Sequence, residues 1–392
     1  MGPSDHRYPT WVSYPATPPQ QRPFIPPLPR RIRKVGAPLA VIIALGTVVG
    51  FIVIVIVAVN PVGTTIAFTL SSLALIVVLL AYLWLDRWEP EPPRLLVLSF
   101  LWGASVAVVL SVALEVALEP LFGTDGTVWL GAPLIEEAAK GLFLLLMMTG
   151  RRRNELNSLT DCLVYAGVTA AGFAWLENIF YISDSGSIAE SLGTAALRLV
   201  MGPFAHPLFT TMTGIGVYFA LQQRGAVAKA GCILLGYAGA VLMHAAWNGS
   251  SLVSIEAYFL VYLLWMVPVF GLAIALAVHS RRREQRIVAE KLPGMVAASL
   301  VTANEATWLG SLRTRKAAIG EAGRLAGKSQ AKAVKNFAAQ VVELAYVRDR
   351  IDRGFGDQRV YALQNEEAYW VHAARAAAPT LHTLAGYRAA VR

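Results

Sequence analysis

Residues 37–60 contain the stretch LAVIIALGTVVGFIVIVIVAV, which has no charged side chain. A helix needs about 20 apolar residues to cross the hydrocarbon core of a bilayer. An uncharged run of this length therefore predicts a membrane-spanning helix. Charged residues make up only 15 % of the whole chain, against about 25 % in a soluble globular protein. This composition excludes an ordinary cytosolic enzyme.

Seven more apolar runs of similar length follow the first. The eight runs are residues 37–60, 63–85, 95–118, 128–148, 159–182, 198–221, 230–248 and 255–279. The sequence thus predicts an all-α fold, a polytopic membrane bundle with about eight transmembrane helices.

Basic residues fall on one side of the predicted membrane. The cluster at 30–34 precedes the first run, which places the N-terminus in the cytoplasm by the positive-inside rule. Strict alternation then places four further segments there, all of them containing Lys or Arg: 86–94, 149–158, 222–229 and the chain from 280 onward. The opposite connections contain neither residue. We expect a multi-pass membrane protein with both termini cytoplasmic.

Three parts of the chain differ in composition. Residues 1–36 are proline-rich, with six Lys or Arg against one acid, and predict a disordered cytoplasmic N-terminus. Residues 37–279 are the predicted eight-helix core. Residues 280–392 hold nineteen basic and ten acidic residues and predict an Ala-rich, helical cytoplasmic extension. Its amphipathic stripe consists of Val334, Phe337, Val341, Leu344 and Ile351. A role at the lipid surface or with a partner is the alternative for this extension, and no nucleic-acid partner is expected.

Polar residues inside the apolar runs mark the candidate site, because a charge in a spanning helix costs at least about 2.5–3.5 kcal/mol and needs a reason. These residues are Glu136, Glu137, Lys140, Glu177, Asn178, His206, His244 and Asn248. At about 1.5 Å rise per residue, the glutamates and histidines of four helices all fall roughly 6–14 Å below the extracytoplasmic surface. We expect them to form one layer. Glu115 lies nearer a helix end and is interpreted as interfacial.

Two kinds of chemistry fit this layer. Glutamate and histidine are ligands that zinc accepts with water in an open position, and the metal would lower the pKa of that water toward about 7. Alternatively, a desolvated glutamate could activate water without a metal. The candidate metal ligands for Zn2+ are Glu137, Glu177, His206 and His244.

Spacing along the helices assigns further roles. Lys140 is i+4 from Glu136 and i+3 from Glu137, so it can neutralise one of them. Asn248 is i+4 from His244 and could orient the imidazole or hold a substrate carbonyl. The candidate catalytic residues are Glu136, Glu137, Glu177, His206, His244 and Asn248.

Other functions would use the same side chains differently. A proton- or cation-coupled transporter could carry its ion on these acids, although such proteins often contain inverted repeats and no convincing repeat is evident here. The Glu136–Lys140 pair could also be a purely structural contact that fixes helix packing.

Four ordered motifs resemble those of a known family. EEAAK at 136–140, FAWLEN at 173–178, His206 and HAAWN at 244–248 look like the motifs of the PrsW family, within the wider CAAX-prenyl-endopeptidase-like (ABI) superfamily. DRWEPEPPRLL at 86–96 is similar to that family's Asp-Arg-aromatic-Glu-Pro-Glu-Pro segment. The resemblance covers about residues 65–280. Relatives of the CAAX type typically read EExxxR and FxxxH, whereas EExxK and FxxxE here favour PrsW.

The resemblance implies a membrane-embedded endopeptidase of the bacterial cell membrane. PrsW-like proteins cut a membrane-anchored anti-sigma factor on its extracytoplasmic side, so a protein substrate of this kind is the expected partner. It also implies that Glu136 and Glu137 are the catalytic base or metal ligands, joined by Glu177, His206 and His244.

Overall fold

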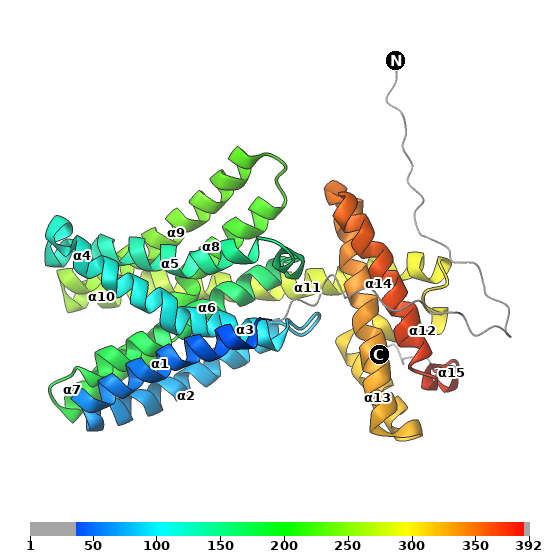
Figure 1. Ribbon diagram of the computed structural model, residues 1–392, viewed down its shortest axis with the longest axis horizontal. Helices are drawn as coiled ribbons and strands as arrows, with labels where there is room; N and C mark the ends of the chain where they lie inside the picture. The colour runs from blue at the N-terminus through cyan, green and yellow to red at the C-terminus, as the bar shows by residue number, and fades with distance from the viewer. Residues whose placement is uncertain (1–36, 388–392) are drawn as a thin grey trace, which may run out of the picture. The chain divides into compact units, whose positions relative to one another are not determined.

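A computed structural model describes residues 37–387, and within this range the regular secondary structure is entirely helical (Figure 1). The predicted proline-rich segment 1–36 lies outside the described residues. The chain divides into two compact units, one from Lys34 to Ser280 and one that begins at Arg281. The all-α, polytopic fold class is confirmed by this helical content and by the long apolar helices of the first unit.

The first unit contains eleven helices. They are α1 (Leu39–Val59), α2 (Pro61–Leu85), α3 (Pro93–Trp102), α4 (Val108–Gly126), α5 (Ala132–Met147), α6 (Leu159–Ser183), α7 (Ile188–Ala195), α8 (Ala205–Leu221), α9 (Ala226–Val253), α10 (Ile255–Val261) and α11 (Val267–Ala297), whose C-terminal part continues beyond Ser280. Short π-helical segments join several of them, including Gly103–Ala107, Thr127–Gly131 and Ala196–Met201.

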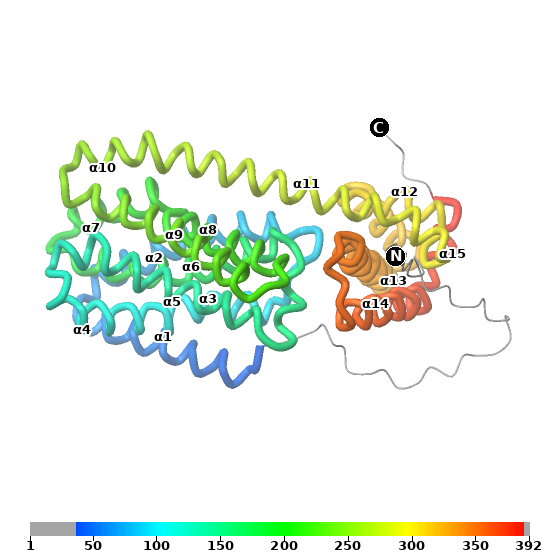
Figure 2. Tube along the Cα trace, turned by 90° about the horizontal axis from the view of Figure 1, so that it is seen from above, coloured from blue at the N-terminus to red at the C-terminus, as the bar shows by residue number. Residues whose placement is uncertain are grey.

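Helix α6 is the centre of this unit. It packs against α2, α3, α5 and α8, and Figures 1 and 2 both show it among them. Nearly all of its side chains are buried, whereas α1 exposes large apolar residues such as Phe51 and Ile54. A helix that is apolar on the outside of a bundle suits contact with lipid rather than water. The polar groups of α6 are therefore enclosed by other helices.

Small residues allow the helices around α6 to approach closely. A side chain at Gly103 would lie 1.9 Å from the carbonyl oxygen of Thr169, and one at Gly172 would lie 2.1 Å from that of Phe100. Only glycine fits at such a crossing, which is the usual way that membrane helices pack tightly. This crossing fixes α6 against the end of α3.

Six helical segments of the described chain are long and apolar enough to cross a membrane. They are Leu39–Val59, Pro61–Leu85, Pro93–Met147, Leu159–Ser183, Ala226–Val253 and Ile255–Ala297. The predicted run 198–221 falls on a π-helical segment and on α8, which has 17 residues. The count of eight crossings and the cytoplasmic location of both ends remain predictions.

The 55-residue segment Pro93–Met147 contains two of the predicted runs, 95–118 and 128–148. Gly123 interrupts it with φ 68° and ψ 169°, a conformation that glycine adopts without strain. Beyond this turn the chain runs back, and α5 packs against α4. The two arms therefore form a helical hairpin whose closed end is at Gly123.

The second unit is a small helical domain. Its helices are α12 (Ala303–Leu309), α13 (Leu312–Arg350), α14 (Gln358–Ala376) and α15 (Thr380–Thr383). The predicted stripe Val334, Phe337, Val341 and Leu344 is buried in its core beside Trp308, and Ile351 is half-buried. The amphipathic pattern thus packs the domain's own core, and the helical nature of the extension is confirmed.

Candidate functional site

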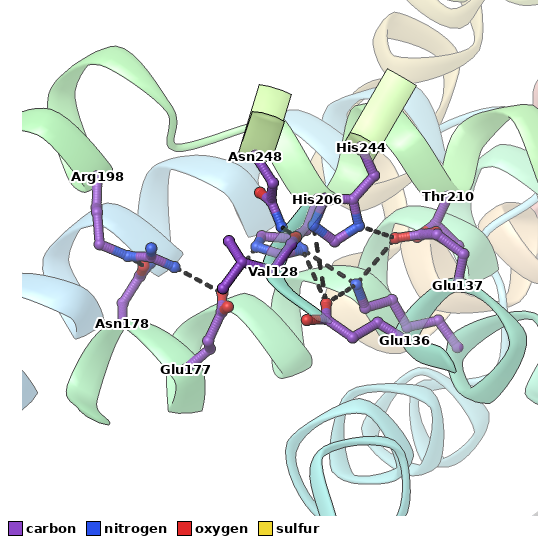
Figure 3. Close-up of polar contacts among 11 residues, drawn as sticks. Val128, Glu136, Glu137, Glu177, Asn178, Arg198, His206, Thr210, His244 and Asn248 are labelled. Atoms are coloured by element: carbon purple, nitrogen blue, oxygen red, sulfur yellow. Dashed lines mark hydrogen bonds and ion pairs between the residues drawn. The ribbon is translucent and has the colours of Figure 1, made fainter. Parts of the chain in front are cut away.

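The candidate site lies between α5, α6, α8 and α9, one helix for each sequence motif. α5 supplies Glu136 and Glu137, and α6 supplies Glu177. His206 is in the first turn of α8, where the following Pro207 is tolerated because the first backbone N–H groups of a helix have no intrahelical partner. The predicted layer of polar residues is a cluster in the structure (Figure 3).

The Lys140 ammonium holds both glutamates of α5. Its Nζ lies 2.9 Å from Glu136 Oε2 and 2.9 Å from Glu137 Oε1, and it is completely buried. It also stands over the ring of Phe173, 3.9 Å from the ring centre. The sequence predicted that Lys140 would neutralise one glutamate, and the structure places it on both.

The two glutamates have different environments. Glu137 is fully buried and accepts two further contacts besides Lys140: its Oε1 lies 3.1 Å from His244 Nδ1, and its Oε2 accepts a hydrogen bond from Thr210 at 2.7 Å. Glu136 lines a cavity and receives a hydrogen bond from Lys140. Glu137 is therefore an internal anchor, and Glu136 is the carboxylate that a ligand can reach.

His206 is held at both ring nitrogens. Its Nδ1 lies 3.0 Å from Lys140 Nζ, and its Nε2 lies 2.7 Å from Glu177 Oε2. An ammonium can only donate, so Nδ1 accepts and Nε2 carries the hydrogen that is donated to Glu177. This assigns the neutral tautomer with hydrogen on Nε2.

His244 is fixed by stacking and by Glu137. Its ring stacks on Phe209 with centroids 4.7 Å apart, and its Nδ1 donates to Glu137. Nε2 is then the free acceptor, 4.0 Å from Glu136 Oε2, and His206 Nδ1 is 3.8 Å from the same oxygen. Three acceptor atoms from three helices thus converge on one small space.

Arg198 completes the far side of the site. Its guanidinium donates to Glu177 Oε2 at 2.6 Å and to Asn178 Oδ1 at 2.7 Å (Figure 3). It also stacks on the ring of Tyr181. Arg198 is not among the site residues predicted from the sequence. One feature of the sequence could have indicated it. Arg198 is a basic residue at the predicted extracytoplasmic end of the run 198–221, on the side where the connections contain no Lys or Arg.

A cavity of about 830 Å³ gives access to the site. Glu136, Glu177 and His206 line it, and so does Asn248. Asn248 donates one amide hydrogen to the Val128 carbonyl at 3.2 Å, which leaves its second amide hydrogen for a ligand. The sequence suggested that Asn248 could orient the His244 imidazole or hold a substrate carbonyl, and in the structure its hydrogen bond is with Val128 rather than with His244. Glu115, interpreted from sequence as interfacial, also lines this cavity.

The donor set fits a divalent metal ion. Glu136, Glu137, His206 and His244 are buried, and one ligand atom of each lies within 4.8 Å of all the others. Carboxylate oxygens with imidazole nitrogens are a usual combination for zinc. The predicted ligand Glu177 is outside this quartet, because its Oε2 contacts Arg198 and His206 Nε2 instead. Glu177 holds His206 through Nε2, which is the position that an outer-shell carboxylate takes beside a metal-binding histidine.

The fold and the site together define a helical, membrane-embedded protein in which glutamates and histidines cluster beside a cavity. The model of the family described as "PrsW family intramembrane metalloprotease" matches residues 91–274. Over this region, which carries all four motifs, the chain belongs to the PrsW family.

Three curated relatives, each named Protease PrsW, support the assignment. That of Geobacillus kaustophilus is 29 % identical over 154 residues, which are 38 % of this chain and 65 % of the relative. That of Oceanobacillus iheyensis is 26 % identical over 210 residues, 52 % of this chain and 93 % of the relative. That of Clostridioides difficile is 30 % identical over 154 residues, which are 37 % of this chain and 63 % of the relative. No solved structure gives a significant match to the chain.

Proposed function

We propose that this chain is an intramembrane endopeptidase that hydrolyses a membrane-anchored protein. The observation that carries the proposal is the convergence of Glu136 Oε2, His206 Nδ1 and His244 Nε2, with gaps of 3.8 and 4.0 Å, beside a cavity that Glu136 and His206 line. Such gaps suit a water molecule or a small cation, since both bind acceptor atoms from several sides. Family membership supports the same reaction class.

In this proposal Glu136 is the general base. It lines the cavity, whereas Glu137 is enclosed by Lys140, His244 and Thr210. Glu136 takes a proton from the attacking water while the water oxygen adds to the scissile carbonyl carbon. Glu136 later returns this proton to the departing amine as the C–N bond breaks. The amide of Asn248 donates to the carbonyl oxygen as it gains charge.

Glu137 and Glu177 are positioning residues. Glu137 holds His244 through Nδ1, and Glu177 holds His206 through Nε2, so the remaining nitrogen of each ring faces Glu136. A divalent ion would be held by the quartet Glu136, Glu137, His206 and His244, and when bound it would lower the pKa of a bound water and polarise the substrate carbonyl.

We further propose, from the family resemblance, that the substrate is an anti-sigma factor cut near the extracytoplasmic side of the cell membrane, with both termini of the enzyme in the cytoplasm. The transporter alternative has no observation in its favour among the described residues.

Hydrolysis is tested by incubating the purified full-length chain with a pool of single-span peptides in ¹⁸O-labelled water. Mass spectrometry should find product pairs in which the new carboxyl terminus carries ¹⁸O. The double variant His206→Ala/His244→Ala should give no such products, while the exposed control variant His279→Ala should equal the unmodified chain. Equal cleavage by the double variant, or no labelled product at all, would overturn the proposal.

A further inference from the structure

One wall of the cavity is a stripe of residues on α4, two of them polar, that the proposed reaction does not use. Val108, Ser111, Val112 and Glu115 line the cavity together with Glu136 and His206. Their spacing of three and four residues places them on a single face of the helix. Thr127, just beyond the turn at Gly123, lines the same cavity.

The polar groups of this stripe lack partners in the described part of the chain. The hydroxyl oxygens of Ser111 and Thr127 are buried and make no hydrogen bond there, and Ser111 is only 1 % exposed. An unsatisfied buried polar group costs folding free energy, as does a charge within a spanning helix. Within residues 37–387 the Glu115 carboxylate also has no ion pair, whereas Glu136 contacts Lys140 and Glu177 contacts Arg198.

The charge of the cavity favours a cationic ligand. The charged residues that line it are Glu115, Glu136, Glu177 and Arg198. The single base already bridges Glu177 and Asn178. The carboxylate of Glu115 is therefore the acid of this wall that is available to an incoming positive charge.

The hairpin geometry gives the distance from the proposed cut. Glu115 lies eight residues before Gly123 and Glu136 thirteen after it, so Glu115 is nearer the closed end by about 7–8 Å at 1.5 Å per residue. An extended peptide spans about 3.3 Å per residue. The offset therefore corresponds to about two substrate residues.

We propose that Glu115 binds a Lys or Arg side chain of the substrate, about two residues from the scissile bond toward the extracytoplasmic end. The hydroxyls of Ser111 and Thr127 bind main-chain groups of the same substrate segment. When the transmembrane helix of the substrate unwinds into an extended segment, its backbone N–H and C=O groups lose their hydrogen bonds and need new partners. The inference rests on the proposed function and adds a substrate preference to it.

Binding rather than cleavage tests this inference, so that it can be judged even where hydrolysis fails. The probes are fluorescent single-span peptides with one Lys at successive positions in the outer half of the span, each paired with an uncharged norleucine twin. They are titrated into the Glu136→Gln variant in nanodiscs. We expect the Lys peptide to bind about tenfold more tightly than its twin at one or two adjacent positions.

Three further substitutions are made in the Glu136→Gln background. Glu115→Gln should remove the preference for Lys, and Glu115→Lys should transfer it to a peptide with Glu at the same position. Glu119→Gln, on the same helix but outside the cavity lining, should keep the preference. Ser111→Ala should weaken both twins equally.

The outcomes separate the inference from the proposed function. No preference for Lys at any position, or a preference unchanged in Glu115→Gln, overturns the role of Glu115 whether or not the chain hydrolyses peptides. A preference that depends on Glu115 in a chain without ¹⁸O-labelled products supports the binding site and refutes the hydrolase.

Discussion

Lys140 Nζ lies 3.0 Å from His206 Nδ1, so an ammonium occupies the side of the imidazole that faces Glu136. This contact joins the first and third sequence motifs. It also places Lys140 on three of the four residues that could bind a metal ion. The ammonium and a divalent cation therefore compete for the same ligand atoms.

Removing this ammonium should change both stability and metal affinity. Breaking a buried ion pair by deleting one partner costs about 3–5 kcal/mol, so Lys140→Met should lower the Tm of the metal-free protein. Zinc should then raise its Tm more than that of the unmodified chain, since the ion replaces the lost charge. Thermal unfolding in detergent with chelator or zinc measures this, with Lys229→Met as the control. An unchanged Tm in chelator would contradict the central role of Lys140.

Metal content should depend on the two histidines. We expect about one zinc per purified chain, with loss of the ion in both His206→Ala and His244→Ala and retention in His279→Ala. Elemental analysis of the detergent-purified proteins, with cleavage assayed on the same samples, gives the answer. Robust cleavage by a preparation without metal would assign the reaction to a glutamate base alone.

Arg198 should act on turnover more than on substrate affinity. It fixes Glu177, which in turn fixes the tautomer and orientation of His206. Arg198→Gln is expected to lower kcat about tenfold with little change in KM, and Arg198→Lys should be intermediate because it keeps the charge. Arg151→Gln, on an exposed turn, serves as the control. A change in KM alone would show that Arg198 contacts substrate instead.

The acidic turn after α2 should make stability depend on pH. Burial raises the pKa of Asp86 from its ordinary value of 3.8 to about 8, and the negative charge of Asp161 adds to the effect. The pKa of Asp86 is therefore higher in the folded state than in the unfolded state. The contribution of protonated Asp86 to the free energy of unfolding is fully present below about pH 4. It is lost as the pH rises through about 8.

Asp86→Asn should remove this dependence. The amide oxygen can still accept the hydrogen bond from the Glu91 backbone N–H, which is 2.9 Å from Asp86 Oδ2. We expect the Tm at pH 8.5 to rise by about 2–4 °C and to change less between pH 6 and 8.5. Asp125→Asn, at an exposed position, should behave like the unmodified chain. A decline with pH as steep as that of the unmodified chain would contradict the assignment.

Sequence alone predicted the helical class and one layer containing Glu136, Glu137, Glu177, His206 and His244, because an ionisable residue in an apolar run is costly and therefore conspicuous. It did not predict that Glu177 lies outside the quartet that could bind a metal. It could not distinguish Glu136 from Glu137, since adjacent residues have the same depth and only packing shows which one faces the cavity. Arg198 was not predicted as a site residue, and Glu115 was interpreted as interfacial, for a related reason. Both lie near the ends of predicted apolar runs, 198–221 and 95–118, where a charge costs little free energy.

The number of crossings shows a second limit. Hydropathy found two apolar runs within Pro93–Met147, but the turn between them depends on the backbone of Gly123. Helix α8 is short and mostly buried by its neighbours, so length and hydropathy describe it poorly. The contribution of α8 to the site is seen in two contacts, those of His206 with Lys140 and of Thr210 with Glu137.

The central claim is that Glu136, and not Glu137, activates the water. The most direct test measures peptide cleavage and Tm side by side for Glu136→Gln, Glu137→Gln and the control Glu119→Gln. We predict that Glu136→Gln loses at least about 100-fold in kcat. Because it breaks one ion pair with Lys140, it should lower the Tm, but less than Glu137→Gln, which disturbs contacts to Lys140, His244 and Thr210. Cleavage by Glu136→Gln at the rate of the unmodified chain would contradict the account.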